Sequence, residues 1–136
     1  MHYLWQWDEL AQHWNNNEFQ EVHDWLNERW SKVVKASPAG DKDPDARFIQ
    51  GLAFAALALY FTQDGNQEGA CLLLDDALMV LPQYAPSHMG IMVEPILETL
   101  HTLRPAISLL GPDDECPFQP FVYNKLMFDR GQYQHG

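Results

Sequence analysis

One stretch of the sequence, residues 44–63, is apolar on nearly every side of the helix that it predicts. The preceding Asp43-Pro44 is typical of a helix that opens with proline in its first turn, and DGN at residues 64–66 predicts a turn at its end. A helix of this kind is stable only when other elements cover most of its surface. Its most apolar part, residues 51–61, is too short to span a bilayer, so we expect no membrane insertion. The stretch therefore predicts the central helix of a bundle, with a core that includes Phe48, Leu52, Phe54, Ala55, Leu57, Ala58 and Leu59.

The segments on either side of this stretch have the spacing of amphipathic helices. Before it, we expect a helix over residues 8–14, with Asp8 as its N-cap, and a second helix over about residues 18–36. After it, we expect a helix over about residues 66–81 and a fifth helix, which follows residues 83–90. Pro105 is expected to kink or end this helix, with its continuation through residues 106–110 as the alternative. No alternation with a period of two predicts a strand. The fold class is therefore all-α, a compact bundle of about five helices.

Gly51 lies inside the predicted central helix, where glycine costs about 1 kcal/mol relative to alanine. Because glycine allows two backbones to come close together, we expect another helix to approach closely at this position. The second helix is the expected neighbour.

The last part of the chain loses the helical rhythm. We divide the chain into a helical bundle domain over residues 1–110 and an irregular C-terminal tail over residues 111–136. Residues 117–128 are rich in apolar and aromatic side chains. This composition predicts that part of the tail packs on the bundle or on a second subunit.

The formal net charge of the chain is -11, with 8 Lys and Arg against 19 Asp and Glu. Nucleic-acid affinity depends largely on cationic side chains, so this balance argues against a nucleic-acid partner. The two cysteines, Cys71 and Cys116, form no CxxC or Cys/His spacing, and the first residues contain no secretory signal. We therefore expect a cytoplasmic protein with reduced cysteines and no cofactor.

Residues 21–30, EVHDWLNERW, raise the question of a reactive site. His23 and Asn27 share one face of the predicted second helix, from which they are expected to meet Arg47 and Gln50 of the central helix. One interpretation is a site in which His23 transfers a proton or binds a metal ion. The other is a set of buried polar groups that form hydrogen bonds and set the register of two helices. No histidine spacing supplies the three or four ligands that a metal needs, so no metal site is predicted.

Five tryptophans lie within the first thirty residues. Trp7, Trp14 and Trp30 fit the apolar stripes of the first two helices, whereas Trp5 and Trp25 fit them less well. Tryptophan is enriched at protein interfaces, so Trp5 and Trp25 are candidate partner-binding residues in an aromatic groove. Partial burial under the C-terminal tail is the alternative interpretation.

Residues 54–82 are similar to one tetratricopeptide repeat in their order of small and large residues. No second copy of comparable quality is present. This resemblance implies helical-hairpin packing and not a solenoid.

Three further segments carry a more specific resemblance. They are His23-Asp24 with a tryptophan seven residues after the histidine, FIQGL at residues 48–52, and GNQEGA at residues 65–70. Together, within about residues 8–104, they resemble the family known as domain of unknown function 309. The resemblance implies a small all-helical fold of no established activity. Asp24 and Asn27 stand where the family usually carries glutamate, and Phe61 where it commonly carries histidine, so a site of the family at this place would be weakened here.

Two functions follow from these patterns as hypotheses. The preferred one is a protein-interaction or scaffold module that binds another protein or a second copy of the chain. It is preferred because catalytic spacings are absent and helical hairpins commonly hold peptides or partner helices. The alternative is a small enzyme or metal-binding protein that uses the polar cluster around His23 and Gln50.

Overall fold

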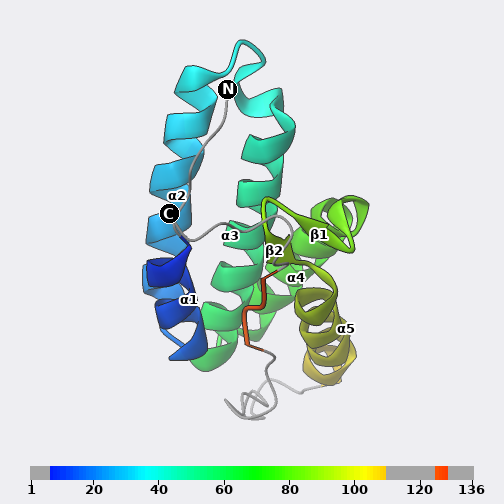
Figure 1. Ribbon diagram of the computed structural model, residues 1–136. Coiled ribbons are helices and arrows are strands. Elements are labelled where there is room, and N and C mark those ends of the chain that lie inside the picture. Colours follow the sequence, from blue (N-terminus) through cyan, green and yellow to red (C-terminus); the bar gives the residue numbers. More distant parts are fainter. Residues whose placement is uncertain (1–6, 110–124, 129–136) are drawn as a thin grey trace.

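The computed structural model describes residues 7–109 and 125–128, and Figure 1 shows their arrangement. The five α-helices are α1 (Asp8–Asn15), α2 (Phe19–Ala36), α3 (Pro44–Gln63), α4 (Gln67–Val80) and α5 (Glu94–Ser108). Two 3-10 turns, η1 (Gly40–Lys42) and η2 (Leu81–Tyr84), and two short strands, β1 (Ser87–His88) and β2 (Ile91–Met92), complete the described elements. The predicted all-α bundle of about five helices is confirmed.

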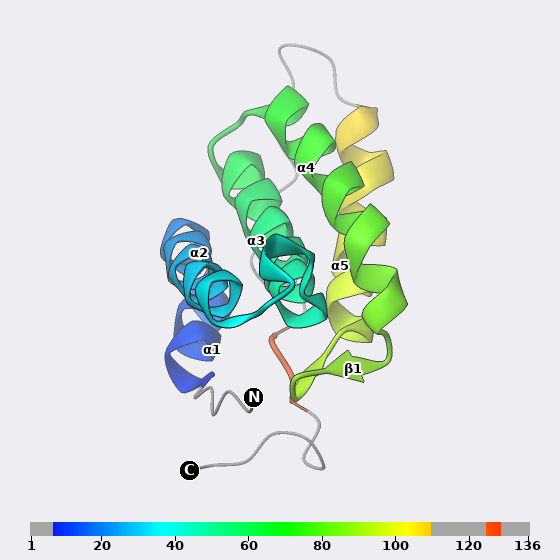
Figure 2. The ribbon, with the colours of Figure 1, turned by 90° about the horizontal axis from the view of Figure 1, so that it is seen from above.

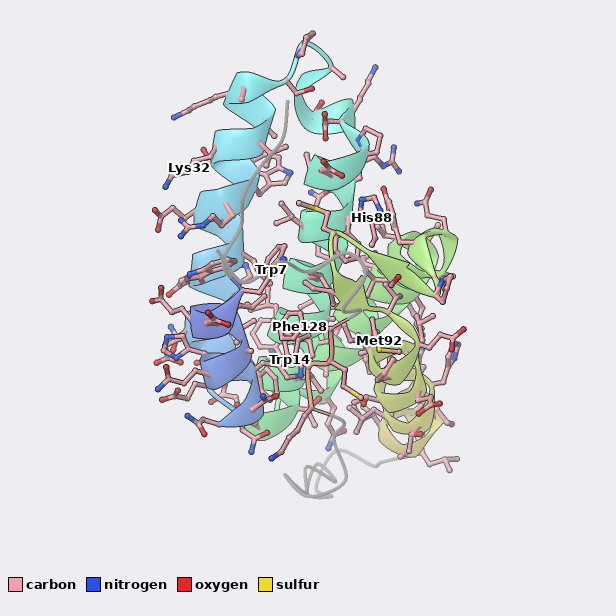
Figure 3. The ribbon with its side chains drawn as sticks, viewed as in Figure 1. Trp7, Trp14, Lys32, His88, Met92 and Phe128 are labelled. Carbon is pink, nitrogen blue, oxygen red and sulfur yellow. The ribbon has the colours of Figure 1, made fainter. Side chains whose placement is uncertain are left out.

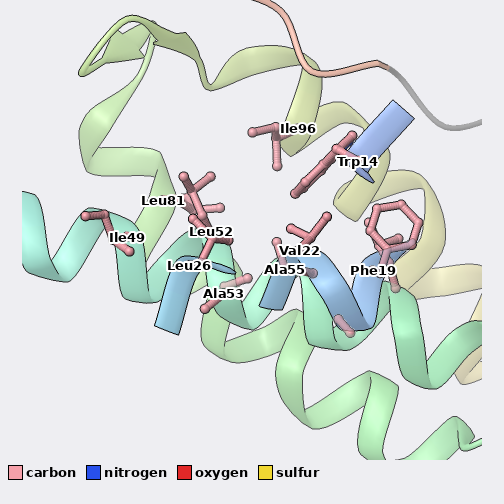
Figure 4. Close-up of a cluster of buried hydrophobic side chains, with 14 of the residues drawn as sticks. Trp14, Phe19, Val22, Leu26, Ile49, Leu52, Ala53, Ala55, Leu81 and Ile96 are labelled. Carbon is pink, nitrogen blue, oxygen red and sulfur yellow. The ribbon is translucent and has the colours of Figure 1, made fainter. Parts of the chain in front are cut away.

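The helix α3 lies between α2 and α4 and packs on both, as Figure 2 shows. Each helix packs mainly on its neighbour in the sequence, with α1 on α2 and α5 on α4. Small residues of α3 let the neighbouring helices approach, and larger ones fill the space between them. Figure 4 shows part of the resulting core, to which α3 contributes Phe48, Ile49, Leu52, Ala53, Ala55, Ala56, Ala58 and Leu59.

One side of α3 is less covered than the sequence predicts. Phe54 and Leu57, which we expected in the core, are only half-buried, and so is Phe61. These residues recur every three or four positions and therefore share one side of the helix. Gln50, four residues before Phe54, continues the same side and is exposed. The central helix is thus buried on most of its surface but keeps one partly exposed apolar stripe.

The start of α3 is held by Asp43, the N-cap residue. Its carboxylate accepts hydrogen bonds from the backbone N–H of Asp45 (2.8 Å) and Ala46 (3.2 Å) and from the hydroxyl of Ser37 (2.7 Å). Pro44 occupies the first turn, where a backbone N–H would have no acceptor within the helix, so the missing N–H of proline costs no hydrogen bond. The sequence signal at Asp43-Pro44 therefore marks the observed helix start.

The Asp43 cap is expected to make the free energy of unfolding depend on pH. Burial raises the pKa of Asp43, but the hydrogen bonds from Ser37, Ala46 and Asp45 outweigh it and hold the pKa below the usual 3.8. At a pH between the folded and the unfolded pKa of Asp43, the unfolded chain binds more protons than the folded chain. The stabilisation by the ionised carboxylate is therefore complete above the unfolded pKa of 3.8 and is lost as the pH falls through the folded pKa. Asp43→Asn keeps a good capping side chain without a titrating charge. We expect the free energy of unfolding, measured with urea from about pH 6 to about pH 3, to fall less steeply in Asp43→Asn than in the wild type. Equal slopes would contradict this account.

Gly51 is the site of a close helix approach, but its neighbour differs from the predicted one. A Cβ atom at this position would lie 2.8 Å from Cγ1 of Val80 and 2.9 Å from Cδ2 of Leu81. These residues belong to the end of α4 and the start of η2, so the prediction of α2 as the neighbour is wrong. The physical reason is the short turn after α3, which returns α4 antiparallel along it and brings the far end of α4 to Gly51.

Pro105 neither ends nor interrupts α5, which continues to Ser108. Pro105 and His101, whose carbonyl would bind the missing N–H, are both exposed. Solvent is therefore near the turn that loses its bond, which reduces the cost of the proline.

A small hairpin and a tail segment close one side of the bundle. Strands β1 and β2 pair antiparallel, and Ile91 of β2 also forms an antiparallel bridge with Phe128. The N–H of Met92 donates to the carbonyl of Met127 (2.9 Å), and the N–H of Leu126 donates to Oδ1 of Asn15 in α1 (2.9 Å). Leu126 is buried, and Figure 3 labels Phe128 and Met92 on this side of the molecule. Residues 125–128 thus pack on the bundle, while the rest of the predicted tail lies outside the described residues.

The sequence showed no strand because each strand is only two residues long, too short for an alternating pattern. Across residues 7–109 and 125–128, none of the helices has the length and apolar character needed to cross a membrane.

Candidate functional site

The four side chains of the predicted polar cluster are not joined to one another. Asn27, Arg47 and Gln50 are exposed, and the side chain of His23 is 30% exposed. Nδ1 of His23 lies 3.5 Å from Oδ1 of the adjacent Asp24, the limit for a hydrogen bond. No hydrogen bond or ion pair links any two of the four within the described part of the chain. The expectation of buried, mutually bonded polar groups is wrong, because these residues face solvent. A proton-transfer role for His23 stays a prediction.

Trp25 is buried, which corrects its assignment as an exposed partner-binding residue. Its side chain is 8% exposed, and its ring lies 5.5 Å from that of Trp7 between centroids. Its indole N–H donates to Oε2 of Glu9 in α1 (3.2 Å), and the guanidinium of Arg29 lies 4.4 Å from the ring centroid. The predicted aromatic groove of the first two helices is thus filled at Trp25 by packing between α1 and α2. Trp5 lies outside the described residues.

The other tryptophans partly follow the prediction. Trp7 and Trp14 are buried in the core, as expected. Trp30 is half-buried, and its indole N–H is buried without an acceptor among the residues that the structure describes.

A cluster that the sequence did not indicate joins the hairpin to the start of α3. Nε2 of His88 lies 2.8 Å from Oδ1 of Asp45, so in the neutral imidazole this nitrogen carries the proton and donates it. The imidazole also contacts the rings of Phe48 and Tyr84, at centroid distances of 4.8 and 4.7 Å. The hydroxyl of Tyr84 donates to the carbonyl of Pro44 (2.9 Å). Asp45 and His88 are 43 positions apart, and no spacing rule connects them.

This cluster resembles a carboxylate–histidine pair of an active site, but its geometry favours a structural role. The three rings contact one another at centroid distances of 4.7 to 5.2 Å, which leaves no room for a ligand between them. Burial raises the pKa of Tyr84, as do the nearby carboxylates of Asp45 and Asp43, while Arg47 lowers it; the phenol therefore stays protonated. We interpret the cluster as the contact that fixes the hairpin on α3.

The clearest functional feature is an apolar surface that continues from α3 onto α4. On α3 it consists of the half-buried stripe Phe54, Leu57 and Phe61. A Cβ atom on Gly69 of α4 would lie 2.9 Å from Cδ2 of Phe61, so the end of this stripe touches α4 at Gly69. Leu72 and Met79 lie three and ten residues after Gly69, within about 80° of it around the helix. We call the surface of Phe54, Leu57, Phe61, Leu72 and Met79 the α3–α4 face.

Two members of the α3–α4 face are unusually exposed for their type. The exposed fraction is 62% for Leu72 and 82% for Met79. They lie seven residues apart, two helical turns, and so point the same way from α4. Sequence reasoning placed this helix next to α3 but did not identify its outer side, because four consecutive apolar residues, Cys71 to Leu74, obscure the periodicity.

The outer side of α4 is acidic. Glu68, Asp75 and Asp76 are exposed, and the helix contains no lysine, arginine or histidine. Asp75 forms a two-bond ion pair with Arg104 of α5, from Nε to Oδ1 (2.7 Å) and from Nη2 to Oδ2 (3.1 Å). The hydrogen bond from Arg104 lowers the pKa of Asp75 and outweighs the opposing effect of burial. Arg104 thus balances the charge of Asp75, whereas Glu68 and Asp76 form no ion pair with another described residue.

Among residues 7–109 and 125–128, no group of three or more His, Cys, Asp or Glu side chains is arranged to hold a metal ion. The α3–α4 face is apolar, and two exposed carboxylates of α4, Glu68 and Asp76, lie next to it, four residues before and after Leu72. This arrangement can bind an apolar and cationic surface.

Fold and surface together define a small all-helical protein of antiparallel helical hairpins with an exposed apolar face. Residues 7–73, from the residue before α1 to the middle of α4, match the model of the family described as domain of unknown function DUF309. Residues 7–73 belong to this family, which confirms the resemblance seen in the sequence. Neither the curated proteins nor the solved structures contain a significant match.

The motifs that carry the resemblance have structural roles here. Gly51 of the FIQGL segment allows the close approach of Val80. In the turn between α3 and α4, Gly65 has a φ of 79°, a conformation that favours glycine. The side chain of Asn66 caps α4 by accepting from the N–H of Gly69 (2.9 Å). These contacts hold α3 and α4 in the relation that creates the α3–α4 face.

Proposed function

We propose that the protein is a protein-interaction module and that its α3–α4 face binds a helix of a partner protein. The observation that carries the proposal is the exposure of Leu72 and Met79 on one side of α4. Burying a leucine or methionine side chain contributes about 1.5–3 kcal/mol, so two such residues beside the Phe54–Leu57–Phe61 stripe favour association. This face replaces the predicted aromatic groove of the first two helices, in which Trp25 is buried.

The spacing of the exposed residues favours a helical partner. Seven residues of α4 correspond to about 10.5 Å along its axis. A helix laid along α4 presents apolar residues at i, i+3 or i+4, and i+7, which covers this distance with two turns. A partner in extended conformation would need free backbone N–H and C=O groups on the binding surface with which to form hydrogen bonds. Helix α4 offers none, because its backbone groups bond to one another within the helix.

Site-specific photo-crosslinking in cells of the native source tests the proposal. A photoreactive amino acid at position 79 is expected to crosslink a defined protein, and Leu72→Asp in the same chain is expected to abolish that crosslink. The same photoreactive residue at Thr102, exposed on α5, is the matched control and should not capture this protein. Equal crosslinking with and without Leu72→Asp would contradict the proposal, because the capture would then not depend on the apolar face.

A further inference from the structure

We infer that the partner helix is cationic, with lysine or arginine side chains on both edges of its apolar stripe. This inference rests on the proposed function and specifies the chemistry of the partner. It arises from charge complementarity: the two exposed apolar residues of α4 are accompanied by Glu68, Asp75 and Asp76, and no cationic residue of α4 balances them.

Only part of this negative charge is compensated inside the molecule. Arg104 holds Asp75 through two hydrogen bonds. Glu68 and Asp76 have no such partner among the described residues, and both are exposed. A bound helix with cationic residues opposite them would supply the missing charges, and one with acidic residues would be repelled.

The positions of the two carboxylates predict the spacing in the partner. Glu68 and Asp76 are eight residues apart, which corresponds to about 12 Å along α4. A partner helix that lies along α4 would therefore place two cationic residues seven or eight positions apart. One apolar residue would lie between them, opposite Leu72, and another would lie beyond the second cationic residue, opposite Met79.

A second copy of this chain fits the surface poorly. Each copy carries a net charge of -11, so two copies repel each other over most of their surfaces. Of the lysine and arginine residues of α2, Arg29 lies over the ring of Trp25 and Nζ of Lys32 is 3.4 Å from Oε1 of Glu28, which leaves Lys35 in the last turn. The occupant is therefore a different, cationic protein segment.

Three synthetic helical peptides test the inference. They share one apolar stripe at i, i+3 and i+7 and differ only at the two flanking positions, which are lysine, glutamine or glutamate. We expect the lysine peptide to bind the full chain most tightly by fluorescence anisotropy, with an affinity about tenfold above that of the glutamine peptide at low salt. This advantage should shrink as salt screens the charges.

A charge exchange locates the contact. The double variant Glu68→Lys and Asp76→Lys is expected to bind the lysine peptide about tenfold more weakly than the wild type does, and to bind the glutamate peptide more tightly. The control is Glu21→Lys with Asp41→Lys, two exposed residues outside α4 that change the net charge by the same amount. This control variant should bind the three peptides with the same order of affinity as the wild type. Circular dichroism shows whether both double variants are folded.

The outcomes separate the inference from the proposed function. If all three peptides bind equally and Leu72→Asp abolishes the binding, the face binds helices but the cationic specificity is wrong. If none binds, the inference is overturned; whether position 79 still crosslinks a partner then decides the proposed function separately. A wild-type dimer that Leu72→Asp converts to a monomer overturns the inference, because a second copy would then cover the face.

Discussion

Gly51→Leu is expected to destabilise the folded chain by about 3 kcal/mol or more. Even a Cβ atom at this position would lie 2.8 Å from Cγ1 of Val80 and 2.9 Å from Cδ2 of Leu81, and leucine adds three further carbons in the same direction. Both neighbours belong to the end of α4 and the start of η2, which α3 needs as its cover. Urea unfolding followed by circular dichroism measures the change in the free energy of unfolding.

Gly51→Ala is the matched variant. Alanine gains about 1 kcal/mol of helix propensity, which offsets part of the cost of moving the stiff side chain of Val80. We expect a loss of about 1 kcal/mol or less for alanine, well below that for leucine. If leucine cost no more than alanine, the close approach of α4 to α3 at this position would be wrong.

Trp25→Ala is expected to lower the free energy of unfolding by about 3–5 kcal/mol, because it removes a large buried side chain. The ring is 8% exposed, contacts Trp7, and donates its N–H to Glu9. Its loss would open a space between α1 and α2 and leave the α1 side of the core incompletely covered. Thermal and urea unfolding of the purified variant provide the measurement.

Trp25→Phe separates the contribution of the ring from that of the hydrogen bond. Phenylalanine keeps most of the apolar contact but cannot donate to Glu9, so we expect a loss of about 1–2 kcal/mol. It should leave crosslinking from position 79 unchanged, because Trp25 is not part of the α3–α4 face. A stable Trp25→Ala variant that fails to capture the partner would instead support the partner-binding role first predicted for this residue.

The limits of α3 could be predicted from the sequence because both of its ends carry local signals. Asp43-Pro44 supplies a cap and a first-turn proline, and Gly65 supplies the left-handed residue that ends the helical hairpin's first arm. Such signals act over a few residues and do not depend on the rest of the fold.

Contacts between distant segments could not be predicted in the same way. Trp25 lies off the main apolar stripe of α2, since that stripe faces α3, whereas Trp25 faces α1. A helix that is covered on two sides has two apolar stripes, and the periodicity of a single sequence does not say which neighbour covers the second one. The pairing of Asp45 with His88 likewise depends on the position of the hairpin.

For the candidate site, too, the local features could be predicted from the sequence, and those that depend on tertiary packing could not. The sequence indicated helical hairpins and an interaction function, but it selected Trp5, Trp25 and the four polar residues. The exposed side of α4 became visible only when the packing of Ala70, Leu74 and Ala77 identified its buried side and left Leu72 and Met79 outside.

The bond between Asn15 and Leu126 bears on the order in which the chain assembles. Helices that pack on their sequence neighbours form through local contacts, which favour rapid folding. The N–H of Leu126, by contrast, reaches a side chain 111 positions earlier. The carbonyl of Met127 in the same segment accepts a bond from Met92, so the segment makes both of its contacts only when α1 and β2 are in place. Docking of residues 125–128 is thus a late event, and the protection of the Leu126 and Met92 amides from hydrogen exchange reports when the two distant parts of the chain have come together.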